Sequence, residues 1–290
     1  MKIIRTIAEL HAARSEARAA GATRVGFVPT MGALHEGHLS LLRTARAEND
    51  LVVLSIFVNP TQFTEPSDLD AYPRTEEADA ALAATAGVDL IFAPDAAELY
   101  PSGHATTVHV AGRLTETLEG AGRGEAHFDG MATIVTKLLL AVLPSTAYFG
   151  QKDAQQLLVV QRMVADLGIP TRIAACPTAR AADGLALSSR NVRLNAAERS
   201  RAIAIPRALA AADALVTEGV RDVGALRAAA SEILAAADIT PEYLAFVIPE
   251  SLAPIDSVDG PVLCAIAARV GEVRLIDNVV LTPTPESTQE

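Results

Sequence analysis

The chain has 290 residues, of which 50% are hydrophobic and 20% are charged, a composition typical of a globular protein with a substantial core. Its formal net charge of −11 argues against a protein whose main role is to hold nucleic acid, because neutralising phosphates requires a basic face. A local group of basic side chains can still bind a small ligand that carries phosphate.

Neither membrane insertion nor secretion is indicated by the sequence. Apolar runs such as Leu51–Val58 are far shorter than the ~20 residues that a membrane helix requires. The N-terminal string MKIIRTIAEL lacks an apolar segment followed by a cleavage site of small residues. Cys176 and Cys264 each lie beside apolar residues, so we expect buried free thiols, with a disulfide as the open alternative. These features predict a soluble cytoplasmic protein.

Short β-branched runs alternate with amphipathic stretches through the first part of the chain. This alternation predicts an α/β fold with a Rossmann-like, doubly wound parallel sheet, in which ligands bind at the carboxyl ends of the strands. We expect strands at Arg24–Val28, Leu51–Val58, Asp89–Phe92, Thr107–Val110, Ala147–Phe149 and Thr171–Ala175, and helices at Glu36–Ala47, Thr75–Thr85, Gly130–Val142 and Ala154–Leu167.

The pattern changes after about Ala181, where helices are followed by consecutive strands. Asn195 and Glu198 have the spacing of a capping pair at the start of a long Ala-rich helix. We therefore predict a catalytic domain over residues 1–180, a small C-terminal α+β lid domain over 181–282 and a disordered tail over 283–290. Further elements are expected at Val223–Ala236 (helix) and at Glu242–Ile248, Val262–Ala267 and Val273–Asp277 (strands).

The segment Pro29–His38 reads PTMGALHEGH and lies between a predicted strand and a predicted helix. His35 and His38 are three residues apart, so they share one face at the start of that helix. Gly32 and Gly37 permit a close backbone approach, and a helix N-terminus favours an anion. The segment predicts a phosphate cradle with two imidazole donors; the alternative is a pair of histidines that only caps a helix. A metal site would need a third ligand, which the sequence does not identify.

This segment resembles the HIGH-type signature of nucleotidylyl transferases and class I aminoacyl-tRNA synthetases, and the longer string PTMGALHEGHLSL resembles the pantothenate synthetase family. Further blocks that resemble this family follow in order: SIFVNPTQF, DLDAYPRT, HFDGMATIVTKL, FGQKDAQQL, DGLALSSRN and, near the C-terminus, RLIDN. The resemblance implies ATP- and Mg²⁺-dependent ligation of pantoate to β-alanine through a pantoyl-adenylate, in a homodimer. A different HIGH-type nucleotidylyl transferase is the alternative.

The same resemblance implies roles for individual residues. Proton or hydrogen-bond donation is expected from His38, and stabilisation of the transferring phosphoryl group from His35, Lys152, Ser188 and Arg190. Without the family, Lys152 reads as a surface lysine and the SSRN string as a linker. The positions expected to bind ATP are Met31, Gly32, Ala33, Leu34, His35, Glu36, Gly37, His38, Gly150, Gln151, Lys152, Asp153, Ala179, Leu187, Ser188, Ser189 and Arg190.

Pantoate and β-alanine are expected to meet amide side chains, which offer both a donor and an acceptor to a hydroxy acid. The resemblance gives Gln62 and Gln156 to pantoate, with Asn59 and His127 beside them; a polar turn and a helix-capping histidine are the plain alternatives. Asp79 is a candidate for the Mg²⁺ region, although most of the metal's ligands would be ATP phosphates and water. We also predict that Thr64–Leu69 and Gly120–Ala126 are mobile gates.

Some positions depart from the family's usual pattern. Gln151 and Ala154 replace a glutamate and an aromatic residue in the FGQKDAQQ block, and Ala179 and Met131 each replace a common valine. Residues 124–126 replace a shorter stretch before the HFDG block. No reactive group is lost, so we expect these changes to alter affinity more than chemistry.

Overall fold

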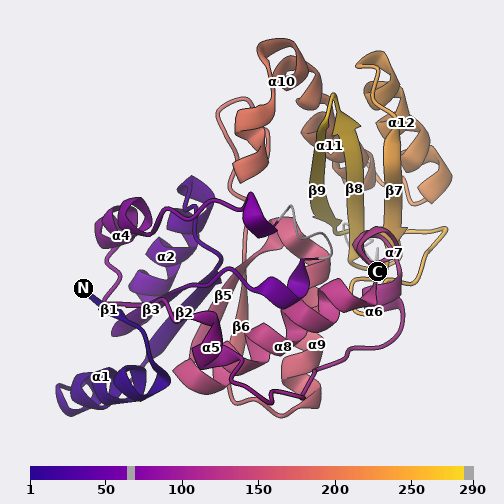
Figure 1. The fold of residues 1–290 in the computed structure, drawn as a ribbon. Helices are drawn as coiled ribbons and strands as arrows, with labels where there is room; N and C mark the ends of the chain where they lie inside the picture. Colours follow the sequence, from indigo (N-terminus) through magenta and orange to yellow (C-terminus); the bar gives the residue numbers. More distant parts are fainter. Residues whose placement is uncertain (64–68, 284–290) are drawn as a thin grey trace. The chain divides into compact units, whose positions relative to one another are not determined.

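The computed structural model describes residues 1–63 and 69–283 (Figure 1). The chain divides into two compact units: the first comprises Met1–Gln151 and Gln155–Pro177, and the second comprises Lys152–Ala154 and Thr178–Glu290. Residues 64–68 of the expected gate at Thr64–Leu69 and residues 284–290 of the expected tail at 283–290 lie outside the described residues. Within the described ranges, every helix is too short or too polar to cross a membrane.

A six-stranded sheet forms the centre of the first unit, with the order β1-β4-β3-β2-β5-β6 and parallel pairing throughout. From β2 the chain proceeds to β3 and β4 in one direction and later to β5 and β6 in the other, so the order reverses between β2 and β5. This confirms the predicted doubly wound fold and locates its switch point. The strands are β1 (Lys2–Ile4), β2 (Val25–Thr30), β3 (Leu51–Ile56), β4 (Leu90–Phe92), β5 (Thr146–Gly150) and β6 (Arg172–Cys176).

Helices connect these strands and cover the sheet. Helices α2 and α4 contact each other, and buried residues such as Leu42, Leu54 and Ile91 form one apolar cluster between them and the strands. The main helices are α1 (Ile7–Ala19), α2 (Glu36–Glu48), α4 (Glu76–Thr85), α8 (Glu125–Val142) and α9 (Ala154–Asp166). The short ones are η1 (Pro60–Gln62), α5 (Ala96–Leu99), α6 (Arg113–Glu116), α7 (Glu119–Arg123) and η2 (Gln151–Asp153).

One predicted strand was wrong. Thr107–Val110 has the alternation of a strand but forms none, because the N–H of Val108 donates to the Thr133 hydroxyl of α8 (2.9 Å) instead of to a neighbouring strand. Strand β1 was not predicted, since three residues are too few to establish a period.

The second unit contains a three-stranded antiparallel sheet of order β7-β8-β9 and a group of helices. Asn195 and Glu198 form the predicted capping box, with both bonds at 2.9 Å. The Ala-rich segment is nevertheless two helices, because Pro206 has no N–H to donate to the carbonyl of Ala202. The elements are η3 (Ser189–Arg193), α10 (Ala196–Ala202), α11 (Ala204–Thr217), α12 (Val223–Ala236), β7 (Pro241–Val247), β8 (Val262–Val270) and β9 (Val273–Leu281).

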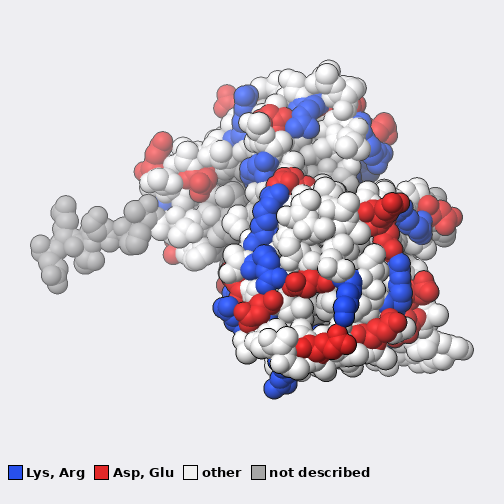
Figure 2. All heavy atoms as spheres, turned by 90° about the vertical axis from the view of Figure 1, so that its left-hand side faces the viewer, with Lys and Arg blue, Asp and Glu red and all other residues white. Residues whose placement is uncertain are grey.

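The two thiols match the sequence-based expectation. Cys176 and Cys264 are both free and buried, and burial raises the pKa of the Cys264 thiol to about 12. On the face drawn in Figure 2, Lys and Arg side chains are interspersed with Asp and Glu side chains. That face offers no extended basic area of the kind that nucleic acid requires.

Candidate active site

The loop that follows β2 lies at the switch point of the sheet. We call residues 31–38, which include both histidines, the histidine loop. The hydroxyl of Thr30 donates to the carbonyl of Ser55 (2.7 Å) and accepts from the N–H of Gly32 (3.2 Å), so the loop starts from a fixed position on β3. Gly32 and Ala33 both have positive φ, at 85° and 50°. This conformation reverses the chain into α2, and it favours glycine at the first of the two positions.

The two histidines of this loop are held by the backbone of the first turn of α2. The N–H of Gly37 donates to Nδ1 of His35 (3.1 Å), and the N–H of His35 donates to Nδ1 of His38 (3.3 Å). The ring centroids lie 4.1 Å apart. Since Nδ1 accepts in both rings, a neutral imidazole carries its proton on Nε2, and both rings present an Nε2–H donor. The structure therefore shows the capping contacts of the two histidines, and their role as phosphate donors stays a prediction.

Asp79 of α4 contacts this loop directly. Its carboxylate accepts the N–H groups of Ala33 (2.9 Å) and Leu34 (2.7 Å), as well as the Thr75 hydroxyl (3.1 Å). Two of the loop amides that the sequence offered as a phosphate cradle are thus bonded within the protein. A pocket of about 420 Å³ adjoins the loop at the carboxyl ends of β2, β3 and β4 and is lined in part by Met31, Gly32, Ile56, Arg74, Thr75 and Asp79.

Gln62 lies against the histidine loop, since its Nε2 is 3.0 Å from the Met31 sulfur. Its Oε1 accepts from Nδ2 of Asn59 (3.1 Å), which also donates to the carbonyl of Gly130 (3.0 Å). The other side of the Asn59 amide, Oδ1, accepts from the hydroxyls of Tyr100 (2.8 Å) and Thr61 (3.0 Å). Asn59 is 1% exposed, so it supports Gln62 from behind, a role that the sequence did not suggest.

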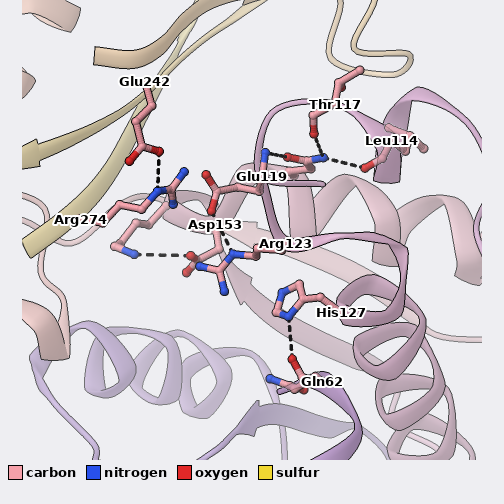
Figure 3. Close-up of polar contacts among 11 residues, drawn as sticks. Gln62, Leu114, Thr117, Glu119, Arg123, His127, Asp153, Glu242 and Arg274 are labelled. Atoms are coloured by element: carbon pink, nitrogen blue, oxygen red, sulfur yellow. Dashed lines mark hydrogen bonds and ion pairs between the residues drawn. The ribbon is translucent and has the colours of Figure 1, made fainter. Parts of the chain in front are cut away.

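His127 also holds Gln62, as Figure 3 shows. Its Nδ1 lies 2.8 Å from the main-chain carbonyl oxygen of Gln62, so the neutral ring donates from Nδ1. Burial lowers the pKa of His127, and the Gln62 carbonyl only partly opposes this shift. The histidine therefore favours its neutral form.

The carboxyl end of β5, on the other side of the switch point, leads into η2 and α9. Gly150 ends the strand, Gln151–Asp153 form η2, and Gln156 lies in the first turn of α9. The neighbouring Gln155 is buried, although the sequence gave no reason to select it. Its Nε2 donates to the carbonyls of Leu114 (2.9 Å) and Thr117 (2.8 Å), and its Oε1 accepts from the N–H of Glu119 (2.9 Å; Figure 3).

Lys152 belongs to the second unit. Its ammonium lies 3.4 Å from the Asp153 carboxylate, and its side chain is 16% exposed. The Lys152 carbonyl accepts from Nδ2 of Asn278 on β9 (2.9 Å), so the RLIDN block fixes the backbone at this lysine.

A hairpin-like turn in the second unit carries two of the positions expected to bind ATP, Ala179 and Leu187. The N–H of Leu187 donates to the carbonyl of Ala179 (2.9 Å), and Arg180 forms a bridge with Ala186. Arg180 makes two bonds to the buried carboxylate of Asp277, at 2.6 and 3.0 Å. The turn is thereby attached to β9.

Ser188 and its neighbours continue from that turn. The Ser188 hydroxyl caps η3 by accepting the N–H of Arg190 (3.2 Å), and Ser189 and Arg190 are exposed. In residues 1–63 and 69–283, no three His, Cys, Asp or Glu side chains are arranged to hold a metal ion. The described residues, Asp79 included, therefore form no group of three such side chains that could hold Mg²⁺ without substrate.

A doubly wound parallel sheet with a histidine-bearing strand–loop–helix segment at its switch point defines a nucleotide-binding α/β enzyme. The sequence model of the family described as pantoate-beta-alanine ligase matches residues 2–280. The chain belongs to the pantoate–β-alanine ligase family.

Individual relatives agree with this assignment. The chain is 53% identical over 277 residues to a pantothenate synthetase of Chelativorans sp., with 96% of each chain covered. It is similar to a crystal structure of pantothenate synthetase from Thermus thermophilus (TM-score 0.90, 48% identity, 98% and 100% coverage). It also resembles a pantoate-beta-alanine ligase from Francisella tularensis, complexed with beta-gamma ATP and beta-alanine (TM-score 0.76, 35% identity, 97% of each chain).

Proposed function

We propose that the chain joins pantoate to β-alanine at the expense of ATP, giving pantothenate, AMP and pyrophosphate through an enzyme-bound pantoyl-adenylate. The observation that carries this proposal is the match to the pantoate–β-alanine ligase family over residues 2–280, which includes the histidine loop at the switch point.

In the first step a pantoate carboxylate oxygen attacks the α-phosphorus of ATP, and the bond to the pyrophosphate oxygen breaks. Negative charge builds on the phosphoryl oxygens, so fixed hydrogen-bond donors accelerate this step. We assign that task to the Nε2–H groups of His35 and His38, with Lys152, Ser188 and Arg190 on the phosphates. The two Nδ1 contacts support this assignment, because they set the tautomer before substrate binds.

In the second step the amine of β-alanine attacks the carbonyl of the adenylate, loses a proton and expels AMP. We assign Gln62 and Gln156 to pantoate. Asn59 and His127 act through Gln62, as their bonds to its side chain and main chain favour. No covalent enzyme intermediate is required, so a nucleophilic side chain has no part in the scheme.

Magnesium enters this scheme as part of the substrate, Mg·ATP. Mg²⁺ retains water and relies on substrate phosphates, which suits a chain whose described residues form no three-ligand group. We also propose that residues 181–282 act as a lid and that the 120–126 segment is mobile. Hydrogen exchange with and without ATP and pantoate tests both proposals. We further propose that the protein is a cytoplasmic homodimer, and sedimentation tests the dimer.

The decisive experiment measures AMP and pyrophosphate from ATP and Mg²⁺, with pantoate and β-alanine added singly and together. A ligase releases AMP in many turnovers only when all components are present. With pantoate alone it releases about one equivalent of pyrophosphate per site. Multiple-turnover pyrophosphate release without β-alanine would instead favour another HIGH-type nucleotidylyl transferase, and independence from pantoate would remove the substrate assignment.

A further inference from the structure

Asp79 lies 45 residues after Leu34 in the chain, yet both of its carboxylate oxygens are used by the histidine loop. Oδ2 accepts the N–H of Ala33 at 2.9 Å, and Oδ1 accepts the N–H of Leu34 at 2.7 Å. The hydroxyl of Thr75, the N-cap residue of α4, donates to Oδ2 at 3.1 Å and fixes the carboxylate's orientation. The Asp79 residue is only 2% exposed, so these bonds are sheltered from water.

The loop has a conformation that needs such support. Ala33 has a φ of 50°, which an L-amino acid with a side chain adopts only when its surroundings enforce it. At Gly32 a Cβ atom would lie 3.0 Å from the Asp79 carboxylate and 3.1 Å from Ile56, so the two chain segments meet closely there. The carboxylate and the glycine therefore determine the path of the loop together.

The fixed backbone leads directly into the two histidines. Leu34 immediately precedes His35, whose own N–H donates to Nδ1 of His38. A rotation of the peptides that Asp79 holds would displace this N–H and with it the acceptor contact of His38. The backbone that carries both imidazoles is thus bonded to the Asp79 carboxylate through the N–H groups of Ala33 and Leu34.

We propose that Asp79 is a positioning residue for His35 and His38, and that it is not a ligand of Mg²⁺. Buried, hydrogen-bonded carboxylate oxygens suit the first role, whereas Mg²⁺ keeps several waters and needs an accessible oxygen. The kinetic part of this proposal depends on the proposed ligase function; the bonds to the loop do not.

The first test compares Asp79→Asn with Glu77→Gln, an exposed position on the same helix. An asparagine presents an N–H₂ group to one of the two donating amides, so we expect kcat to fall on the order of 10–10²-fold, with Glu77→Gln unchanged. The Mg²⁺ concentration that gives half-maximal rate should be the same in all three proteins. A raised Mg²⁺ requirement, with the rate restored by excess Mg²⁺, would identify Asp79 as a metal ligand and overturn the proposal.

The second test needs no substrate. In ¹⁵N-labelled protein, the amide resonances of Ala33 and Leu34 should move upfield in Asp79→Asn, and the ring ¹⁵N signals of His35 and His38 should show a loss of the single tautomer. Unchanged signals in a folded variant would overturn the proposal whether or not the protein is a ligase. If Asp79→Asn does not fold, Thr75→Val keeps the carboxylate and removes only its bond to the Thr75 hydroxyl. The same resonances should then move by a smaller amount, and unchanged resonances would also overturn the proposal.

Discussion

Nδ1 of His127 lies 2.8 Å from the main-chain carbonyl oxygen of Gln62, while Nδ2 of Asn59 lies 3.1 Å from its side-chain Oε1. Gln62 is therefore held at both ends by residues from different elements, α8 and the turn before η1. A proposed pantoate contact is thus prepared before substrate arrives, which reduces the ordering that binding requires.

We expect His127→Ala to raise the KM for pantoate about fivefold, because one hydrogen bond of about 1 kcal/mol no longer holds the Gln62 peptide. The KM for ATP should change little. His127→Asn retains an N–H donor and should recover part of the loss. His109→Ala is the matched control. His109 is an exposed histidine that bonds to Asp129, and Asp129 lies on α8, the helix that carries His127. Equal effects of the two alanine variants would contradict a specific role for His127.

The lowered pKa of His127 predicts a pH-dependent stability. The unfolded chain binds a proton at His127 more readily than the folded chain, so this contribution to stability is present above the ordinary pKa of 6.5 and decreases as the pH falls through it. The nearby Arg123 acts in the same direction as burial, and Glu119 opposes both. Denaturant unfolding from about pH 7.5 to about pH 5.5 should show wild type losing stability relative to His127→Asn. A constant difference between the two would exclude the effect.

The sequence predicted the fold well because hydrophobic periodicity reports burial directly. The loop at the switch point was predictable for the same reason. A glycine-containing stretch between a buried strand and an amphipathic helix has few possible conformations other than a tight strand-to-helix turn. Asp79 was proposed for Mg²⁺ because an isolated carboxylate reveals nothing about its partners, and here these are main-chain N–H groups far away in the sequence. Gln155 was overlooked for the same physical reason: its three partners are backbone groups.

Gly130 should not tolerate a side chain. A Cβ there would lie 2.5 Å from the Thr61 carbonyl oxygen and 2.8 Å from the Gln62 nitrogen. Gly130→Ala should therefore lower the free energy of unfolding by about 1–3 kcal/mol and raise the KM for pantoate. Gly122→Ala, where nothing lies within 4 Å of the added atom, is the control. Chemical denaturation of both variants checks the prediction, and equal stability would refute the close approach of α8 to η1.

Gln155 predicts a charge-dependent defect. Gln155→Glu would place a carboxylate against the carbonyls of Leu114 and Thr117, so it should lower the free energy of unfolding by about 2–3 kcal/mol near neutral pH. The loss should diminish in acid, where the new carboxyl group is protonated and can donate one bond. Gln161→Glu, exposed on the same helix, should have little effect. A defect that does not depend on pH would count against this arrangement.

The Arg180–Asp277 pair should be important for ATP binding. Asp277→Asn removes the charge from a side chain that is 2% exposed and accepts two bonds from Arg180, so we expect a loss of stability of about 3 kcal/mol. The KM for ATP should rise because the turn that carries Ala179 and Leu187 loosens. Asp238→Asn breaks a surface pair whose carboxylate is 98% exposed, and it should cost under about 1 kcal/mol. Calorimetry of the two variants tests the difference in stability, and rate measurements over a range of ATP concentrations test the change in KM.

The bonds from Asp79 to the histidine loop also set a rule for protein engineering. A graft of Pro29–His38 into another α/β scaffold would transfer the two imidazoles but leave the amides of Ala33 and Leu34 without their acceptor. The transferable module is discontinuous: it consists of the loop together with a carboxylate on a helix that arrives from a later crossover. A chimaera with a breakpoint between residues 38 and 79 should therefore preserve catalysis only when the parent that contributes residue 79 supplies that carboxylate.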